Sequence, residues 1–413
     1  MIVLFDDLCA RGFEPFASTR PLGEMRVGAL LIRERWAHRL GTSISSFVGA
    51  PHLATFTEFD SPPAARGTLP VGTIIAHARA VPFLVGVDGS GADAHVDGWL
   101  MDGRLAAVRL SAALDSATLA RGERTLESLV VPTSVLSIEG VWLDEVWDIV
   151  RHLHALLLHD IPALAASLAC AAFEDTDSDA RGPVVLGGHP VWLEAGARVE
   201  PYSVFDTTLG PVLLRDGAVV QAFTRVVGPC YVGRSSTVMA DRISGSSIGD
   251  HCRVHGELSA TVMIGHANKG HDGFVGHSVL GRWVNLGAGT VTSNLKNTYG
   301  NVALWTPTGV RDTGLQFLGT LFGDHTKTGI GLRLTTGCVL GAGANVMDGM
   351  PPKVVAPFSW GTRVPYDVYA LPKFLETAER VMSRRAVTMD AAQRAHLTHV
   401  YAFAIANARW FAR

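Results

Sequence analysis

Charged residues are scarce in this 413-residue sequence, and its cysteines are few and scattered. Asp, Glu, Lys and Arg make up only 18% of the chain against 47% hydrophobic residues, which excludes a disordered chain and supplies a sizeable buried core. The net charge of -3 gives no basic surplus for nucleic acid or an anionic membrane. The five cysteines have no C-x-x-C spacing, which argues against a disulfide framework or a thiolate zinc site and favours a reducing cytoplasm.

Uninterrupted apolar runs are also missing. The first five residues are apolar, but they lack a basic flank and two aspartates follow at once, so no signal peptide is expected. The most apolar later stretch, 156–173, is broken by a histidine, an aspartate and Pro162, which argues against a membrane span. We interpret it as a buried helix that Pro162 ends or restarts. The sequence therefore predicts a cytoplasmic protein without a membrane partner.

The first 180 residues have the pattern of an α/β domain. Short apolar segments bounded by turn residues predict strands, and apolar residues at helical spacing predict helices. The expected strands are 2–5, 73–76 and 82–87, and the expected helices are 28–40 and a segment that begins near 146. The polar segment 175–181 is expected to link this domain to a second one.

From residue 184 a repeat of six residues replaces this pattern. Bulky apolar side chains recur at every sixth position, which fits neither a helix nor an alternating strand. The clearest members are Leu214, Val220, Val226, Val232 and Val238; further ones are Leu193 and Val199, Ile248 and Val254, then Phe274, Leu280, Leu286 and Thr292, and Leu334, Leu340 and Val346. Such a period predicts a left-handed parallel β-helix of hexapeptide repeats, with stacked coils around a continuous apolar column. The 44 glycines suit its many turns.

The repeat stops after residue 350, where two prolines follow. A helix is predicted at 372–385, and Asp390 with Gln393 has the spacing of a capping box for a last helix. These helices could cover the open end of the solenoid. The expected domains are therefore 1–180, α/β; 184–362, β-helix; and 363–413, a helical extension.

Two polar clusters interrupt the repeat, at 265–299 and at 323–329. A stacked coil has no evident structural need for Lys269, His271, Asn294 or Lys327, so these residues are candidates for chemistry. Histidine is the natural base for acyl transfer to an amine, because its unperturbed pKa lies near ~6.5. Lys269 and Lys327 could pair with a phosphate.

The first cluster resembles the acetyltransferase domain of the bifunctional N-acetylglucosamine-1-phosphate uridylyltransferase/glucosamine-1-phosphate acetyltransferase family. The matching segments are K-G-H-D-G-F-V-G at 269–276 and N-L-G-A-G-T-V-T-S-N at 285–294. The resemblance implies that His271 deprotonates a sugar amine and that Asn294 contacts the substrate or acetyl-CoA. Phe274 stands where that family has a tyrosine, so one hydroxyl is missing. Further substrate contacts are expected at Lys269, Asp272, Phe274, Asp324, His325 and Lys327, with His325 as the rival base.

The whole chain resembles a divergent, GlmU-like branch of sugar-phosphate nucleotidyltransferases. The matching segments include L-F-D-D at 4–7, T-R-P at 19–21, T-G-L-Q-F at 313–317, G-D-H-T-K-T-G at 323–329 and F-S-W-G at 358–361. The resemblance implies nucleotide-sugar synthesis, with a sugar phosphate, a nucleoside triphosphate and acetyl-CoA as ligands, and a homotrimeric assembly.

The N-terminal half departs from well-known nucleotidyltransferases. It lacks their G-x-G-T-R-M loop after the first strand, where backbone amides cradle a triphosphate. Arg20 and Arg26 could contact phosphates instead, beside Asp7 in a nucleotide site. Mg²⁺, which prefers carboxylates and substrate phosphates, could bind one of three aspartates: Asp6, Asp7 or Asp88. The alternative is that Asp7, Arg20 and Glu24 form a structural salt-bridge network.

Two other functions remain open on the sequence. A β-helix zinc hydratase could draw imidazole ligands from across a subunit interface, since a catalytic zinc needs about three protein ligands. The available histidines are His251, His255, His266, His271 and His277. The other possibility is a non-catalytic scaffold, in which the first domain binds a sugar nucleotide and the β-helix only trimerises.

Overall fold

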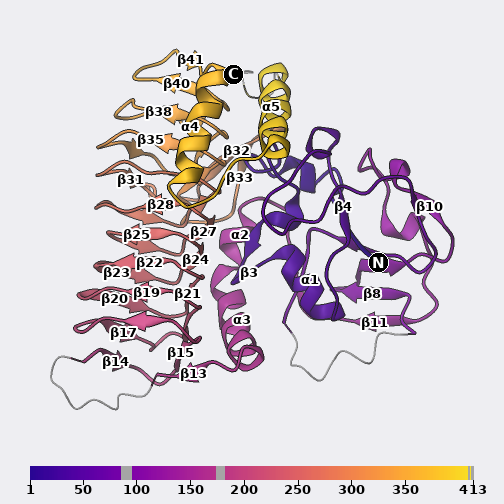
Figure 1. The fold of residues 1–413 in the computed structure, drawn as a ribbon, viewed down its shortest axis with the longest axis horizontal. Coiled ribbons are helices and arrows are strands. Elements are labelled where there is room, and N and C mark those ends of the chain that lie inside the picture. The colour runs from indigo at the N-terminus through magenta and orange to yellow at the C-terminus, as the bar shows by residue number, and fades with distance from the viewer. Residues whose placement is uncertain (85–94, 174–181, 408–409, 411–413) are drawn as a thin grey trace.

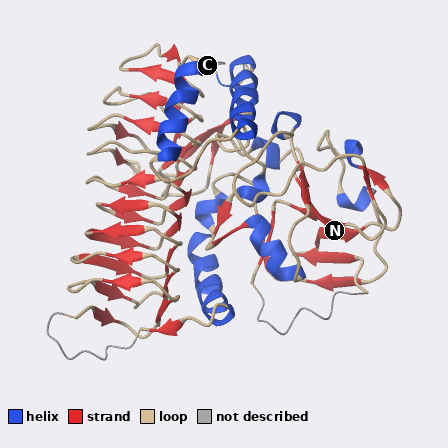
Figure 2. Ribbon diagram, viewed as in Figure 1, coloured by secondary structure: helices blue, strands red, loops and turns tan. Residues whose placement is uncertain are grey.

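The computed structural model describes residues 1–84, 95–173, 182–407 and 410. An α/β domain stands beside a long parallel β-solenoid, and two helices follow the solenoid along the chain (Figures 1 and 2). This confirms the predicted fold class. Asp88 and the predicted linker at 175–181 lie outside the described residues.

The N-terminal domain is built on a six-stranded mixed sheet. Strand β1 lies between β6 and β4 and is parallel to both. The order across the sheet is β11 (Val135–Ser137), β8 (Gly98–Met101), β9 (Arg104–Arg109), β6 (Ile74–His77), β1 (Ile2–Phe5) and β4 (Ser46–Val48). Three two-stranded pairs accompany it: β2 (Arg26–Val27) with β3 (Leu30–Leu31), β5 (Thr68–Leu69) with β10 (Leu114–Asp115), and β7 (Ala80–Pro82) with β12 (Gly140–Trp142). Of the strand expected at 82–87, only Pro82 belongs to a strand, β7; residues 83 and 84 are not in a strand, and 85–87 lie outside the described residues.

Helix α3 shows that the expected break at Pro162 is wrong. The helices of this domain are α1 (Ile32–Leu40), α2 (Asp148–Arg151) and α3 (Leu153–Ser167). Helix α3 continues through Pro162, which removes one backbone hydrogen bond but leaves the helix held by its neighbours. Two residues earlier, the buried carboxylate of Asp160 pairs with Arg35 of α1 and accepts a hydrogen bond from the Ala29 amide at 2.8 Å. This tertiary contact fixes the helix where the local sequence would interrupt it.

The solenoid has three faces, and each coil adds one strand to a face. The first face contains β15 (Val191–Leu193), β18 (Val212–Leu214), β21 (Cys230–Val232), β24 (Ser247–Asp250), β27 (Val262–Gly265), β30 (Val279–Leu280), β34 (Thr320–Phe322), β37 (Cys338–Leu340) and β39 (Val354–Val355), after the antiparallel β13 (Ala171–Ala172). The second face contains β14 (Val184–Leu186), β17 (Val204–Asp206), β20 (Thr224–Val227), β23 (Asp241–Ser244), β26 (Leu258–Ser259) and β29 (Val275–Gly276).

The third face is interrupted in the middle of the solenoid. Its strands are β16 (Arg198–Val199), β19 (Val219–Val220), β22 (Thr237–Met239), β25 (Arg253–His255) and β28 (Asn268–Lys269), then β35 (Lys327–Thr328), β38 (Asn345–Val346), β40 (Ser359–Gly361) and the antiparallel β41 (Asp367–Val368). Single parallel bridges through Asn285 join the two halves. Strands β31 (Val291–Thr292) and β36 (Arg333–Leu334) pair nearby, and β32 (Ala303–Thr306) with β33 (Gly309–Asp312) forms a hairpin outside the coils.

The interior of the solenoid contains most of the side chains predicted from the six-residue period. Leu214, Val220, Val226, Val232 and Val238 all belong to one buried cluster that fills the coils. The position predicted for Phe274 is wrong by one residue, since Val275 occupies the interior and Phe274 is only half-buried. The polar turn at 270–273 shifts the register, because a strand displaced by one residue turns every side chain to its other face.

The corners of the coils require left-handed backbone. At one corner the residues with positive φ on successive coils are His251 at 56°, His266 at 54° and Trp283 at 62°. Their rings stack along the solenoid, with centroids 4.8 Å apart for the two histidines and 4.5 Å apart for His266 and Trp283. The next coil places His325 at this corner, also with positive φ. Because residues other than glycine adopt the left-handed backbone at this corner, only some of the turns depend on the 44 glycines.

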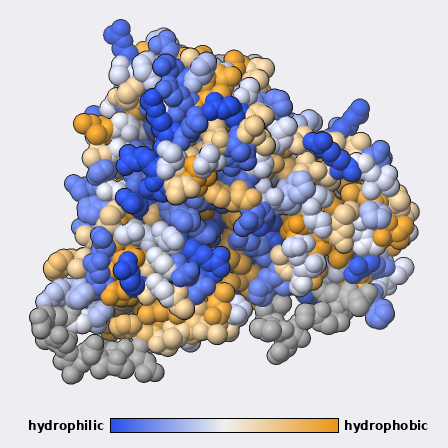
Figure 3. Space-filling model, in the orientation of Figure 1, coloured by the Kyte–Doolittle hydropathy of each residue, from blue (hydrophilic) through white to orange (hydrophobic). Residues whose placement is uncertain are grey.

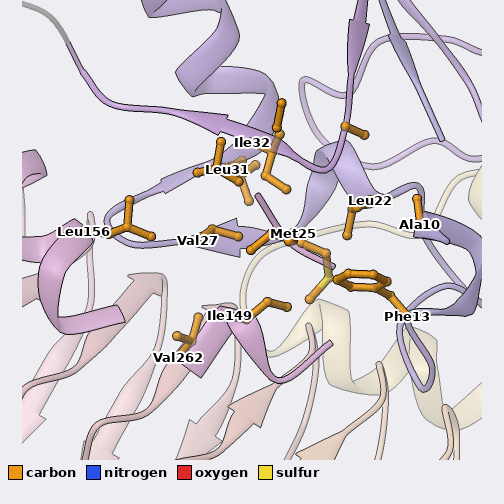
Figure 4. Packing of buried hydrophobic residues seen from close by; sticks show 14 of the residues in the cluster. Ala10, Phe13, Leu22, Met25, Val27, Leu31, Ile32, Ile149, Leu156 and Val262 are labelled. Atoms are coloured by element: carbon orange, nitrogen blue, oxygen red, sulfur yellow. The ribbon is translucent and has the colours of Figure 1, made fainter. Parts of the chain in front are cut away.

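The first face of the solenoid is buried against the N-terminal domain. Its outward side chains join that domain's hydrophobic cluster, and they include Leu213, Tyr231, Val262, Ile264, Val279, Leu321 and Val339. Figure 4 shows Val262 beside Ile149 of α2, with Met25 and Val27 nearby. Helix α3 runs along this face (Figure 1). The two domains thus share one core.

A buried network of four charged groups joins the domains beside this core. Arg20 pairs with Glu58 at 2.9 Å and with Asp324 of the solenoid at 2.8 Å. Arg282 of the solenoid approaches the same Glu58 oxygen at 2.8 Å. Asp324 also accepts a hydrogen bond from the Thr19 hydroxyl at 2.7 Å. The two arginines lower the pKa of Glu58 to about 2 against the opposing effect of its burial.

The C-terminal helices α4 (Leu371–Ser383) and α5 (Ala391–Ala406) pack beside the last coils. The predicted capping box is confirmed, because the Asp390 side chain accepts from the Gln393 amide and the Gln393 side chain accepts from the Asp390 amide. Helix α5 also contacts the N-terminal domain, where His396 bonds the Thr19 carbonyl and Phe403 stacks on His52. The C-terminal helices therefore help to hold the N-terminal domain and the solenoid together. Among the described residues, no helix has the length and apolar character to cross a membrane.

The interdomain network predicts a specific loss of stability. Replacing Arg20 by Met leaves Glu58 and Asp324 buried without their shared cation, so R20M should lower the free energy of unfolding by about 3–5 kcal/mol in urea titrations. The matched control is R242M, whose arginine pairs with Glu257 on the surface and should cost at most about 1 kcal/mol. Equal losses in the two variants would contradict the structural role of Arg20.

Candidate functional site

Lys269 lies inside the coil that carries the predicted catalytic turn. It pairs in register with Val254, an interior residue of the preceding coil, and it is only 2% exposed. Its ammonium donates hydrogen bonds to the carbonyl oxygens of His255, at 2.6 Å, and His271, at 2.7 Å. Burial lowers its pKa to about 8. The expectation that the coil has no structural need for Lys269 is therefore wrong, and binding a phosphate would require the ammonium to leave these carbonyls.

His271 and Asp272 form the exposed tip of this turn. The Asp272 carboxylate lies 3.6 Å from Nδ1 of His255 on the preceding coil. It is therefore close to the imidazole of His255 and not to that of its sequence neighbour, His271. His271 makes no hydrogen bond through its imidazole within the described residues, and its carbonyl is held from inside by Lys269. The turn thus presents a free imidazole on a fixed backbone.

Phe274 and Asn294 meet at the next corner of the solenoid. A Cβ added to Gly276 would lie 2.4 Å from Phe274 Cζ and 2.8 Å from Asn294 Nδ2, so both side chains cover this glycine. The Asn294 amide bonds Nδ1 of His277 at 2.9 Å, and the His277 ring stacks on Phe317. Burial lowers the pKa of His277, which favours a neutral ring. The sequence pointed to His277 only as a zinc ligand and missed this pairing with Asn294.

Two surface depressions meet at Phe274. One, of about 590 Å³, is lined by Gly273, Phe274, Asp241, Arg242 and Glu257 among others. The other, of about 610 Å³, is lined by Phe274, Thr292, Ser293, Lys296 and Arg333 among others. Gly273 and Phe274 follow His271 closely in the chain, so both depressions begin within three residues of it, although the His271 side chain itself lines neither.

The second polar cluster lies at a different corner of the coils. His325 is buried between Trp283 and Phe374 of helix α4, and burial holds its pKa well below the usual range. It precedes β35 on the third face, whereas His271 follows β28 and leads into the second face. Lys327 donates to the His325 carbonyl at 2.9 Å, and Asp324 belongs to the interdomain network. The structure therefore places His325 away from the turn of His271, although other residues of the two clusters are neighbours, such as Asn285 and Lys327.

The carboxyl ends of the parallel strands in the N-terminal domain carry an ion cluster. In open α/β sheets this edge is where ligands bind. Arg79, just after β6, donates to both carboxylate oxygens of Asp7 at 2.8 to 3.1 Å, and His77 lies 3.5 Å away. Asp6 is buried, accepts a hydrogen bond from the Leu22 amide, and has its pKa raised to about 7 by desolvation.

These carboxylates do not fit a Mg²⁺ ion as they stand. The oxygens of Asp7 are occupied by Arg79, and Asp6 is enclosed. Within the part of the chain that the structure describes, no three His, Cys, Asp or Glu side chains gather as a metal site. The same finding applies to the five histidines considered for zinc: His251 and His266 stack on each other at one corner, His255 lies beside Asp272, and His277 pairs with Asn294.

Arg20 and Arg26 are both buried among protein partners. Arg20 binds Glu58 and Asp324, and Arg26 donates to the carbonyls of Ala29 and Ile264. Their roles as nucleotide contacts stay predictions. To bind a nucleotide, the guanidinium groups of Arg20 and Arg26 would have to leave these partners. The alternative of one salt-bridge network is also corrected, because Asp7 pairs with Arg79, Arg20 with Glu58 and Asp324, and Glu24 with Arg33.

Comparison with known proteins finds one matching family and several partly similar curated proteins. Residues 2–168 match the family described as sugar nucleotidyl transferase. The Bifunctional protein GlmU of Acaryochloris marina is 29% identical over 161 residues, which cover 38% of this chain and 30% of that protein. Its namesake from Desulfitobacterium hafniense (strain DSM 10664 / DCB-2) is 28% identical over 203 residues, covering 42% of this chain and 41% of that protein. The Bifunctional protein GlmU of Jannaschia sp. is 32% identical over 102 residues, which cover 24% of this chain and 22% of that protein.

The chain spans less than half the length of these curated relatives. The match at residues 2–168 and the distant similarity to GlmU proteins support a transferase. Residues 2–168 of the chain thus match the sugar nucleotidyl transferase family, a parallel β-solenoid follows them, and parts of the chain are similar to bifunctional GlmU proteins.

Proposed function

We propose that this protein is a cytoplasmic transferase of nucleotide-sugar synthesis whose solenoid transfers an acetyl group from acetyl-CoA to a sugar amine. The observation that carries the proposal is the turn of His271, which presents a free imidazole on a backbone pinned by Lys269. The two depressions beside Phe274 supply room for an acceptor and a donor.

His271 acts as the general base in this reaction. Its neutral imidazole takes a proton from the sugar amine as the nitrogen attacks the thioester carbonyl and a C–N bond forms. The C–S bond then breaks, and the imidazolium gives its proton to the sulfur, so coenzyme A leaves as the thiol. Asn294, whose amide bonds His277, is the proposed contact for the substrate or the donor. Phe274 supplies an apolar wall without the hydroxyl of the related enzymes.

Substitution of His271 tests this assignment. H271A should lower the turnover of acetyl transfer by about 10²–10⁴ with little change in substrate affinity, because general-base catalysis contributes in that range. The control is H325A, which removes a ring buried under α4 and should leave turnover within a few-fold in the folded fraction. If only H325A abolishes transfer the base is misassigned, and if neither variant does the acetyltransferase proposal fails.

The N-terminal domain is proposed to bind a sugar phosphate and a nucleoside triphosphate. A second candidate is that it binds a sugar nucleotide without transferring it. The observation in favour of the second candidate is the pairing of Asp7 with Arg79, together with the missing glycine-rich loop.

Pyrophosphate release distinguishes these two candidates. Incubation with UTP or dTTP, a panel of sugar 1-phosphates and Mg²⁺ should release pyrophosphate if the domain transfers nucleotides, as its family match leads us to expect. Binding of the product sugar nucleotide without pyrophosphate release would instead support the second candidate. Heat-denatured protein serves as the background control.

A homotrimer is proposed as the assembly. The apolar first face cannot form the three-fold contact of the trimer, because the N-terminal domain of the same chain covers this face. The second face and its corners remain available, and they expose Val184, Leu186, Tyr202 and Phe223, the last at 73%. Closed symmetric assemblies commonly bury such side chains.

Light scattering tests the assembly. Dilute protein should show three times the 44.0 kDa chain mass, and F223D should shift the population towards monomer while R198Q, at an exposed arginine of the third face, should not. A 44.0 kDa species alone in the wild type would exclude the trimer.

A further inference from the structure

A cleft of about 290 Å³ lies between helix α4 and the third face of the solenoid. Four cationic side chains line it: Arg253, Lys327, Arg384 and Arg385. Figure 3 shows hydrophilic side chains gathered over α4 and the adjoining coils. No acidic residue lines the cleft, and none of the four cations pairs with a carboxylate in the described ranges of the chain.

The solenoid side of the cleft is a ladder of polar residues in strict register. Arg253 stands opposite Asn268, Asn268 opposite Asn285, and Asn285 opposite Lys327 on successive coils. The Asn268 amide donates to Asn285 Oδ1 at 2.8 Å, which leaves the Asn285 amide hydrogens free as donors. Neighbouring strands are separated by about 4.8 Å, so the ladder offers donors at regular short intervals.

The helix side of the cleft holds a guanidinium without a partner. Nε of Arg385 is buried and makes no hydrogen bond with any residue that the structure describes. Desolvation and the charges of Arg253 and Arg384 lower the pKa of Arg385, which shows that these cations repel one another. The ammonium of Lys327 donates one hydrogen bond to the His325 carbonyl and has two further N–H donors. An anion in the cleft would relieve the repulsion and satisfy the unused donors.

We propose that this cleft binds the diphosphate group of an organic ligand. Arginine forks and amide donors match the tetrahedral oxygens of phosphates, and the donors here extend over four successive strands, farther than one phosphate reaches. The volume admits a diphosphate, and the remainder of the ligand extends along the solenoid surface. The proposal does not depend on the role of His271.

Calorimetric titration with inorganic pyrophosphate, UDP and coenzyme A tests the site. Inorganic pyrophosphate should bind saturably, and R385Q should weaken binding at least about tenfold, as expected for the loss of a charge-assisted hydrogen bond. The matched control is R380Q on α4, five residues earlier, whose arginine is paired with Glu376 and should not matter. Exposed Arg253 gives a second variant, R253Q, that does not endanger folding.

The two organic probes identify the source of the diphosphate. Tighter binding of coenzyme A assigns it to an acyl donor, and tighter binding of UDP assigns it to a nucleotide or nucleotide sugar; either outcome supports the site. Absence of saturable binding for all three probes overturns the proposal. Unchanged affinity in both R385Q and R253Q overturns it as well.

Discussion

The burial of one solenoid face against the N-terminal domain is the constraint on which the remaining structure depends. That contact removes the apolar side chains of the first face from water and encloses the network of Arg20, Glu58, Arg282 and Asp324. Buried charges of this kind persist only when each has its partner, so the network fixes how the domains sit together. It also decides which solenoid surfaces stay open, because only the second and third faces remain for ligands or for other copies of the chain.

The interior of the solenoid holds the backbone of the His271 turn at one point. Lys269 stands in register with the interior residue Val254, and its ammonium donates hydrogen bonds to the carbonyl oxygens of His255 and His271. The exposed His271 is thus connected to the core through backbone alone. A buried polar group with its hydrogen bonds satisfied gives rigidity to a segment that would otherwise be a loop.

The regular stacking of coils has a second consequence on the third face. Residues 15 to 42 positions apart in the sequence stand opposite one another on adjacent strands, so Arg253, Asn268, Asn285 and Lys327 form one continuous surface. Helix α4 then brings Arg384 and Arg385 over this ladder. A solenoid can therefore assemble a charged cleft from residues that share no local motif.

The sequence by itself determined the architecture. The six-residue period located the interior side chains, the spacing of Asp390 and Gln393 located the last helix, and the polar turn around His271 was visible because it interrupts the repeat. Tertiary structure alone decided the positions of the charged residues. Arg20, Arg26, Asp324 and Lys269 look like ligand contacts in the sequence, yet each is buried with protein partners. Periodicity reports which side chains leave water, whereas the partner of a buried charge depends on segments up to about three hundred residues away, such as Thr19 and Asp324.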